Sequence, residues 1–359
     1  MKFKYLSIQN CRELLPSRFD IRFLREFDCT LEVIDTSGDH IGAITKAIQR
    51  NESTQGKKPW DRQFVYDIDI CPTLDYRKNE IEWRIQDYYI ESQRARSGIN
   101  KRIHAMFSLI YEDGGRWTFK MPLQYLLKGW GDANEGYQGY SHCVKLRGMK
   151  DLFGEVIPDD TEFVEKCYSG ITKRNWLQRL EEHLRQVRQG GKKLFHQAWR
   201  EAADANDVVY TSFLQHVNLS YEEVMQWEEM YVDQHTLAPK GLNMIPGGFE
   251  GNKYLYKHRI TDRLDIDLEE RERAVTEYAL QHPLKGIPNP FMSELWKTDE
   301  HYLKVIAARD KTLSPDQVRK IRELGKLGYS ASTIKREVDA LNVQQVKNVL
   351  MDRTYKRIH

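Results

Sequence analysis

Five polar residues occupy positions at which the surrounding sequence would favour apolar side chains. They supply a phenol, a guanidinium, an imidazole, a carboxylate and an amide: Tyr168, Arg179, His183, Glu228 and Asn243. Arg179 and His183 are one helical turn apart, so they would share one face of a helix. Groups of these kinds can bind an anion, exchange a proton or hold a hard cation. Their order along the chain therefore indicates a chemical site.

The first three of these residues would be positioned by a strand and the helix that follows it. The stretch FVEKCYSG at 163–170 predicts a strand that ends in a glycine. Asn175 and Gln178 have the spacing of a capping box, which predicts that a helix begins there. The pair Gly190-Gly191 predicts the end of that helix.

The carboxylate and the amide belong to a later part of the chain. The pattern predicts a second helix at 192–202 and a strand at 207–217. Ser220 and Glu223 form another capping box, so a third helix is expected at 221–233. The carboxylate lies in the middle of this helix, and the amide follows it.

Three stretches, in this order, resemble the GIY-YIG nuclease family. YSGITKRNWLQRLEEH (168–183) resembles its Tyr-Ile-Gly strand and arginine-bearing helix, with Ser169 in place of the aliphatic residue. KKLFHQAWREA (192–202), with His196, resembles its second helix. WEEMYVDQHTLAPKGLNMIPGG (227–248) resembles its metal-binding glutamate helix and terminal asparagine. The resemblance implies a site-directed DNA endonuclease of the homing or phage type.

The resemblance also implies a role for each polar residue. Glu228 would hold Mg²⁺ or Mn²⁺, and Arg179 would hold the scissile phosphate, for which a guanidinium fork is suited. Tyr168 would orient or deprotonate the attacking water or hydrogen-bond the phosphate. His183 would pass a proton or contact phosphate, and Asn243 would fix the backbone of the site.

The first strand of the family, which reads Gly-Ile-Tyr, has no matching tyrosine in the expected register. The strand is predicted at 142–148, and Val144 occupies that register. Because a strand alternates faces, His142 and Tyr140 share the side of Val144. We expect His142 to act as the general base, with Tyr140 as the fallback, since imidazole accepts a proton near neutrality. The alternative is a histidine at the strand end that faces water.

The segment 313–359 resembles the helix-turn-helix modules that are appended to such nucleases. Ser314 with Gln317, and later Asn342, predict the starts of helices. The segment has ten Lys and Arg against five Asp and Glu, which favours double-stranded DNA as the partner. A three-helix interaction domain is the alternative. The expected base and phosphate contacts come from Gln344, Gln345, Lys347, Asn348, Arg353, Lys356 and Arg357.

These patterns predict an α+β protein in four parts. Residues 1–138 would form an uncharacterised α+β domain, and 139–250 a small antiparallel sheet flanked by helices. Residues 251–312 would form a linker with a charged helix, which either tracks DNA or is a spacer. Residues 313–359 would form the all-α DNA-binding domain.

Within the first part we expect a strand at 64–70 that ends at Pro72. Isoleucines at helical spacing predict a helix at 79–90. A strand and a short helix are predicted at 116–127. The glycine-rich stretch 129–139 is expected to be a loop or a domain boundary.

The composition is typical of a soluble protein, with 40% hydrophobic and 30% charged residues. No apolar run approaches a membrane span, so we expect no membrane partner. The five cysteines form no CxxC pair, which predicts neither a disulfide framework nor a zinc site. They favour a cytoplasmic protein, nucleoid-associated or phage-encoded, which would act as a monomer on DNA.

Two other functions are compatible with the sequence. The missing first tyrosine favours a DNA-binding regulator that keeps a nuclease fold without cleaving DNA. The second alternative is a structural nucleic-acid protein in which residues 1–138 do the main work. The arginine, glutamate and asparagine described above favour the enzyme.

Overall fold

The computed structural model describes residues 2–16, 20–37, 42–54, 66–75, 80–89, 103–112, 116–146, 164–203, 208–282, 287–299, 302–303 and 311–358. The chain forms two compact units, Met1–Ile287 and Pro288–His359. The first unit is α+β and is built around a mixed sheet. Among the described residues, no helix has the length and apolarity that crossing a bilayer needs.

The sheet of the first unit has seven strands in the order β2-β1-β3-β4-β7-β5-β6. Its strands are β1 Tyr66–Asp75, β2 Glu80–Tyr89, β3 Ile103–Glu112, β4 Arg116–Pro122, β5 Tyr137–Leu146, β6 Val164–Thr172 and β7 Val208–Leu219. The pairs β1–β3 and β4–β7 are parallel, and the other pairs are antiparallel. The expected small antiparallel sheet is thus the β7-β5-β6 end of a larger sheet.

The pairing of β4 with β7 corrects the predicted boundary at residue 138. Trp117 of β4 lies opposite Tyr210 of β7, and their rings stack with centroids 4.6 Å apart. Strands from both predicted domains therefore share one hydrogen-bonded sheet and belong to one compact unit. The glycine-rich stretch is a loop, as predicted, but it leads into β5 rather than into a separate domain.

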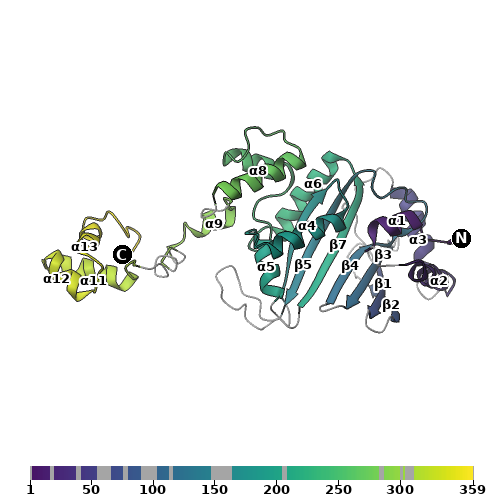
Figure 1. Ribbon diagram of the computed structural model, residues 1–359, viewed down its shortest axis with the longest axis horizontal. Coiled ribbons are helices and arrows are strands. Elements are labelled where there is room, and N and C mark those ends of the chain that lie inside the picture. The colour runs from purple at the N-terminus through teal and green to yellow at the C-terminus, as the bar shows by residue number, and fades with distance from the viewer. Residues whose placement is uncertain are drawn as a thin grey trace, which may run out of the picture. The chain divides into compact units, whose positions relative to one another are not determined.

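The described helices of the first unit lie along the sheet in two groups (Figure 1). Those before the sheet and within its first half are α1 Ile8–Leu14, α2 Ile21–Ser37, α3 Ala43–Thr54 and the 3-10 turn η3 Leu123–Leu126. Those of the second half are α4 Trp176–Arg188, α5 Leu194–Ala203, α6 Tyr221–Tyr231, the π-helical turn η4 Val232–Thr236, α7 Gly248–Lys257 and α8 Leu268–Gln281.

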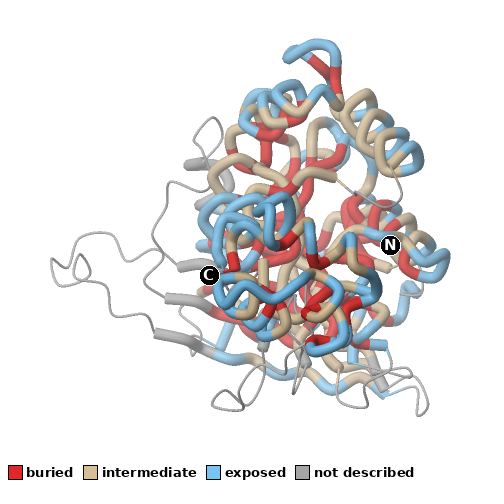
Figure 2. The backbone as a smooth tube through the Cα atoms, turned by 90° about the vertical axis from the view of Figure 1, so that its left-hand side faces the viewer, coloured by how far each residue is buried: buried red, intermediate tan, exposed pale blue. Residues whose placement is uncertain are grey.

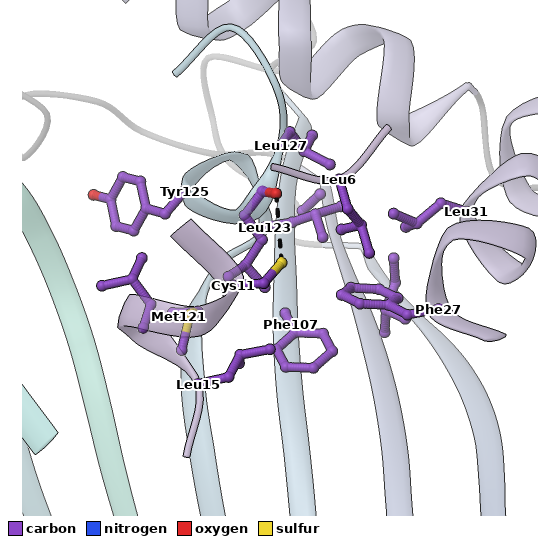
Figure 3. Close-up of a cluster of buried hydrophobic side chains, with 14 of the residues drawn as sticks. Leu6, Cys11, Leu15, Phe27, Leu31, Phe107, Met121, Leu123, Tyr125 and Leu127 are labelled. Atoms are coloured by element: carbon purple, nitrogen blue, oxygen red, sulfur yellow. Dashed lines mark hydrogen bonds between the residues drawn. The ribbon is translucent and has the colours of Figure 1, made fainter. Parts of the chain in front are cut away.

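The first group packs its apolar faces onto β1, β3 and β4 (Figure 3). The rings of Phe27 and Phe107 stack with centroids 4.7 Å apart, and both are fully buried. The Cys11 thiol lies 3.9 Å from the Leu126 carbonyl oxygen in the same cluster. Figure 2 shows buried stretches of the backbone in red and exposed stretches in pale blue.

Two predictions for the first half of the sheet are corrected. Residues 80–89 form strand β2 rather than a helix, because Ile81, Trp83 and Ile85 alternate on one half-buried face. Pro72 does not end β1, which continues to Asp75. Instead it interrupts the parallel pairing with β3, since proline has no N–H to donate.

The two faces of β5 receive different helices. Gly139 faces α6, and a Cβ atom there would lie 2.6 Å from the ring of Trp227. Tyr140, the next residue, points to the opposite face together with His142 and Val144. That face packs against α4 and α5 through Leu180, Phe195 and Trp199. The arginine-bearing helix α4 therefore covers one face of this part of the sheet, and the glutamate-bearing helix α6 covers the other.

A disulfide joins Cys143 of β5 to Cys167 of β6, which corrects the prediction that the cysteines form none. The two residues lie directly opposite each other in the antiparallel pairing. The sequence gives no CxxC signal for this pair because the pairing, not the spacing, brings the two residues together. Cys11, Cys29 and Cys71 are free thiols.

The predicted linker at 251–312 is also corrected, because the first unit extends to Ile287. The expected charged helix is present as α8, capped by Asp267. It belongs to the first unit together with α7. Helix α7, which contains Lys253 and Tyr254, begins at the Gly247-Gly248 turn and packs against α6.

The second unit contains three helices in the expected places, preceded by α9 Pro290–Leu295. They are α11 Pro315–Lys326, α12 Ala331–Glu337 and α13 Val343–Leu350. The predicted capping box of Ser314 and Gln317 and the predicted Asn342 cap are both confirmed. The helices bury a common apolar core formed by Val318, Ile321, Ile334, Val338, Val346 and Val349.

The contact between Gly139 and Trp227 gives a test of the packing of α6. We expect Gly139→Ala to lower the free energy of unfolding by about 1–3 kcal/mol, because the buried indole cannot move away from the added methyl group. Urea denaturation measures this loss. In the Trp227→Leu background the same substitution should cost less, and strictly additive losses would contradict the proposed contact.

Candidate active site

One pocket at the β6 edge of the sheet gathers four of the five residues singled out above. Tyr168, Arg179, Glu228 and Asn243 line it together with Tyr140. These residues come from β6, α4, α6, the loop after η4, and β5. The pocket is completed by α8, which contributes Arg271, Glu272 and other residues. Residues far apart in the sequence thus meet in a single cavity.

Tyr140 crosses the neighbouring strand at Gly170, its partner in the antiparallel pairing. A Cβ atom on Gly170 would lie 2.8 Å from the Tyr140 hydroxyl oxygen. The glycine of the Tyr-x-Gly motif therefore makes room for the tyrosine of the strand beside it. Burial raises the pKa of Tyr140, against the opposing effect of Arg179. The hydroxyl is a protonated hydrogen-bond donor at neutral pH.

Tyr168 lies beside Tyr140 in the pocket. Its ring stacks on Phe195 with centroids 4.9 Å apart, and the ring of His183 meets it edge-on at 5.3 Å. Burial raises the pKa of Tyr168, and the nearby Tyr140 adds to this effect. Both pocket tyrosines are thus neutral phenols that can donate a hydrogen bond to water or to an anionic oxygen.

Arg179 is buried on the inner face of α4, and its side chain is only 9% exposed. Its guanidinium pairs with Glu182 on the same helix and, at 2.9 Å, with Glu272 of α8. Burial alone would lower the pKa of Arg179, but Tyr140 and Glu272 outweigh it and raise the pKa. Arg179 is therefore a permanent cation aimed into the pocket.

Glu228 is a buried carboxylate in the middle of α6, only 3% exposed. It accepts a hydrogen bond of 2.8 Å from the backbone N–H of Gly248, at the start of α7. Both of its oxygens lie 2.9 Å from the Arg271 guanidinium of α8. Gly247 and Gly248 allow this close backbone approach, since Cβ atoms on them would collide with the carbonyls of Glu228 and Met225.

Asn243 holds the backbone of β6 next to the pocket. Its side-chain amide accepts from the Ser169 N–H and donates to the Ser169 carbonyl, both at 2.8 Å. The loop after η4 is thereby fixed to the strand that carries Tyr168. This geometry fits the expectation that Asn243 positions the site rather than reacting.

His142 does not line the pocket, which corrects its expected place as the general base. It is fully buried beneath Tyr140, and its Nδ1 lies 2.7 Å from the Ser212 hydroxyl. Burial, assisted by Arg179, lowers the pKa of His142 to about 3. The imidazole is therefore neutral, and it is buried away from the pocket. Tyr140, the fallback residue, is the one that reaches the pocket.

His183 and His196 form a buried pair behind Tyr168. The Nδ1 of His183 lies 3.3 Å from the Nε2 of His196. Burial lowers the pKa of His183 well below its ordinary value and that of His196 to about 3. Neither residue lines the pocket. The structure therefore places His183 as a support for the tyrosine ring, not as a phosphate contact.

Several charged pocket residues were not singled out from the sequence. Lys193, just before α5, lines the pocket, and burial lowers its pKa. Arg174 lines it too and pairs with Glu272 at 3.3 Å. Arg271 and Glu272 are neighbours in a helix whose sequence shows only abundant charge. No pattern in the sequence indicates that this helix, rather than any other, would cover the site.

Glu228 is also the residue at which a metal ion has to be considered. Among the described residues, the only group of three potential ligands is Cys143, Glu165 and Cys167, whose cysteines are joined by the disulfide. Glu228 instead offers one carboxylate beside the pocket. Mg²⁺ keeps several waters and is often held by one or two carboxylates, so this donor fits it. In this structure both Glu228 oxygens are paired with the Arg271 guanidinium.

The expected DNA-binding residues of α13 divide into exposed and engaged side chains. Gln344 and Lys347 are exposed, and Gln344 donates to Asn348 at 3.0 Å. Gln345 is used within the fold: its side chain accepts from the Leu341 N–H and donates to the Lys311 carbonyl. Gln344, Lys347 and Asn348 thus remain the available amide and lysine groups on this helix.

The basic residues after α13 divide in the same way. Arg353 and Lys356 are exposed. Arg357 pairs with Asp299 and donates to the carbonyls of Trp296 and Lys297 at 2.6 Å each. Its expected role as a phosphate contact is corrected, because these bonds tie the segment after α9 to the three-helix core.

Comparison of the chain with protein-family models, curated proteins and solved structures gives no match in any of the three.

The buried imidazole of His142 gives a test of the site's electrostatics. Its pKa is near 6.5 when unfolded and about 3 when folded, so the unfolded chain binds more protons between these values. The stabilisation is present above pH 6.5 and is lost as the pH falls towards 3. Between pH 7 and pH 5 the free energy of unfolding, measured with urea, should fall by about 2 kcal/mol less in His142→Gln than in the parent. Equal pH dependence would contradict the burial of a neutral imidazole.

Proposed function

We propose that this protein is a metal-dependent DNA endonuclease of the GIY-YIG type, of the homing or phage kind, which hydrolyses phosphodiester bonds in double-stranded DNA. One observation carries the proposal. Tyr140, Tyr168, Arg179, Glu228 and Asn243 converge from separate elements on one pocket. Such a set supplies anion binding, proton handling and a metal ligand within a single cavity.

The pocket residues suit the charge changes of phosphodiester hydrolysis. Arg179 would hold the non-bridging oxygens of the scissile phosphate and neutralise the charge that grows on them. The hydroxyls of Tyr140 and Tyr168 would orient the attacking water, and Tyr140 would take the role of the family's first-strand tyrosine. Asn243 would keep β6, and with it Tyr168, in place through its two bonds to Ser169.

Glu228 would hold a Mg²⁺ or Mn²⁺ ion, which would supply further neutralisation of phosphate charge and a more acidic water. The backbone N–H of Gly248 would keep one carboxylate oxygen oriented. The nearby Lys193, which is half-buried at the pocket wall, would provide a second contact for the DNA backbone. A single carboxylate is compatible with a largely hydrated ion.

The second unit would locate the target as a monomer on DNA. Gln344, Lys347 and Asn348 present amide and ammonium groups on α13, and such groups suit base edges in the major groove. Arg353 and Lys356 would contact phosphates. The excess of acidic over basic residues in 140–250, 17 against 13, supports reliance on this tethered unit for DNA affinity.

A DNA-binding regulator without cleavage is the second candidate. It is favoured by the ion pairs that already satisfy Glu228 and Arg179 within the fold. Incubation with a random-site DNA library and Mg²⁺, with EDTA as the control, distinguishes the two candidates. Metal-dependent ends at a defined position support the nuclease, and enrichment of a site without new ends supports the regulator.

The metal ligand can be tested by Glu228→Gln. The amide keeps an acceptor for the Gly248 N–H but loses the charge that a metal needs, so cleavage should fall by about 10²-fold or more while DNA affinity is retained. Single-turnover cleavage and filter binding measure the two effects. Glu229→Gln, one position further along α6, is the matched control and should cut at the parent rate. Parent-level cleavage by Glu228→Gln would contradict the assignment of Glu228 as the metal ligand.

The proposed DNA contact of the second unit can be tested by Lys347→Ala. Loss of one phosphate or base contact should weaken binding and reduce the slope of log K against log salt concentration by about one. Fluorescence anisotropy at several salt concentrations measures both quantities. Lys326→Ala, at the exposed end of α11, is the matched control. An unchanged slope in Lys347→Ala would place the DNA contact on another surface.

A further inference from the structure

Helix α8 makes two ion pairs with the centre of the candidate site. Arg271 pairs with Glu228, and the next residue, Glu272, pairs with Arg179. Glu272 also reaches Arg174 at 3.3 Å. Two adjacent residues of one helix thus neutralise both the carboxylate expected to hold the metal and the arginine expected to hold the phosphate.

The chemistry of these two side chains matches that of the absent ligands. The Glu272 carboxylate presents anionic oxygens to two guanidinium groups, as a phosphate would. The Arg271 guanidinium presents a cation to both oxygens of Glu228, as a metal ion would. Each of the two residues therefore carries the same sign of charge as the ligand expected at its partner.

The attachment of α8 depends largely on these pairs. None of the described residues of α8 is fully buried. Leu268 and Val275 line the pocket but are only partly buried. By contrast, the segment just before the helix is fixed, because the carbonyl of the buried Ile266 accepts bonds from Tyr221 and Asn252. One end of α8 is thus anchored, while its contact with the site is polar.

We propose that α8 is an internal substrate mimic that closes the site until DNA and a metal ion replace it. This inference rests on the proposed function, since it takes Arg179 as the phosphate site and Glu228 as the metal site. DNA phosphate would replace Glu272 on Arg179, and the metal ion would replace Arg271 on Glu228. The helix would then swing away about its anchor at Ile266.

A fixed structural ion-pair network is the competing explanation for the same contacts. In a fixed network α8 would stay in place when ligands bind. Removal of its ion pairs would then only lower the stability of the fold. The two explanations predict different hydrogen-exchange rates for the α8 amides and different metal affinities. Both quantities can be measured without any cleavage.

The test uses the full-length double variant Arg271→Gln with Glu272→Gln, which keeps side-chain size and removes both charges. Its matched control is Arg273→Gln with Glu277→Gln, two exposed positions on the same helix. Hydrogen exchange of residues 268–281 and Mn²⁺ binding by electron paramagnetic resonance are measured for parent, variant and control. We expect at least tenfold faster exchange and at least tenfold tighter Mn²⁺ binding in the variant alone.

Two further measurements keep the result interpretable. Adding Glu228→Gln to the double variant should abolish the gain in Mn²⁺ affinity. If the double variant does not fold, the parent protein with Mn²⁺ and a short DNA duplex replaces it, and exchange of α8 should accelerate only when both are present. Unchanged α8 exchange under every one of these conditions would overturn the inference. Cleavage of the DNA library by the same proteins reports separately on the proposed nuclease activity.

Discussion

The antiparallel pairing of β5 with β6 is the constraint on which the candidate site depends. Tyr140 lies opposite Gly170, and a side chain on that glycine would meet the tyrosine hydroxyl. A shift of one residue in this register would place Tyr140 and Tyr168 on opposite faces of the sheet. The same alternation turns Gly139 towards α6. One strand pairing therefore places the arginine helix and the glutamate helix around a single strand edge.

Buried charge is the second constraint on the site. Arg179 and Glu228 lie almost without exposure to water, and a buried charge that loses its partner costs about 3–5 kcal/mol. The fold must therefore provide counter-charges whenever no ligand does so. Arg271 and Glu272 provide them from one helix. The same property that makes the pocket suitable for an anion and a cation makes a covering helix necessary in their absence.

The sequence was informative where local rules decide the structure and silent where tertiary pairing decides it. The helix starts at Asn175 and Ser220 and the strand–helix order of the second half follow from local patterns, and the structure agrees. The family resemblance implied that Tyr168 and Arg179 belong to one site, and both line the pocket. The position of Tyr140 depends on its partner Gly170, which only the strand register reveals. Likewise, the charges of α8 look like those of any solvated helix until the fold brings them to the pocket.

If α8 leaves the site only when both of its ion pairs are replaced, metal and DNA binding must be coupled. A metal ion alone would displace Arg271 but leave Glu272 bound to Arg179, so the helix would stay attached on one side. DNA alone would leave Arg271 on Glu228 in the same way. Because coupling is reciprocal, DNA must then raise metal affinity by the same factor as the metal raises DNA affinity. The paired side chains would thus make the site assemble only when both ligands are present.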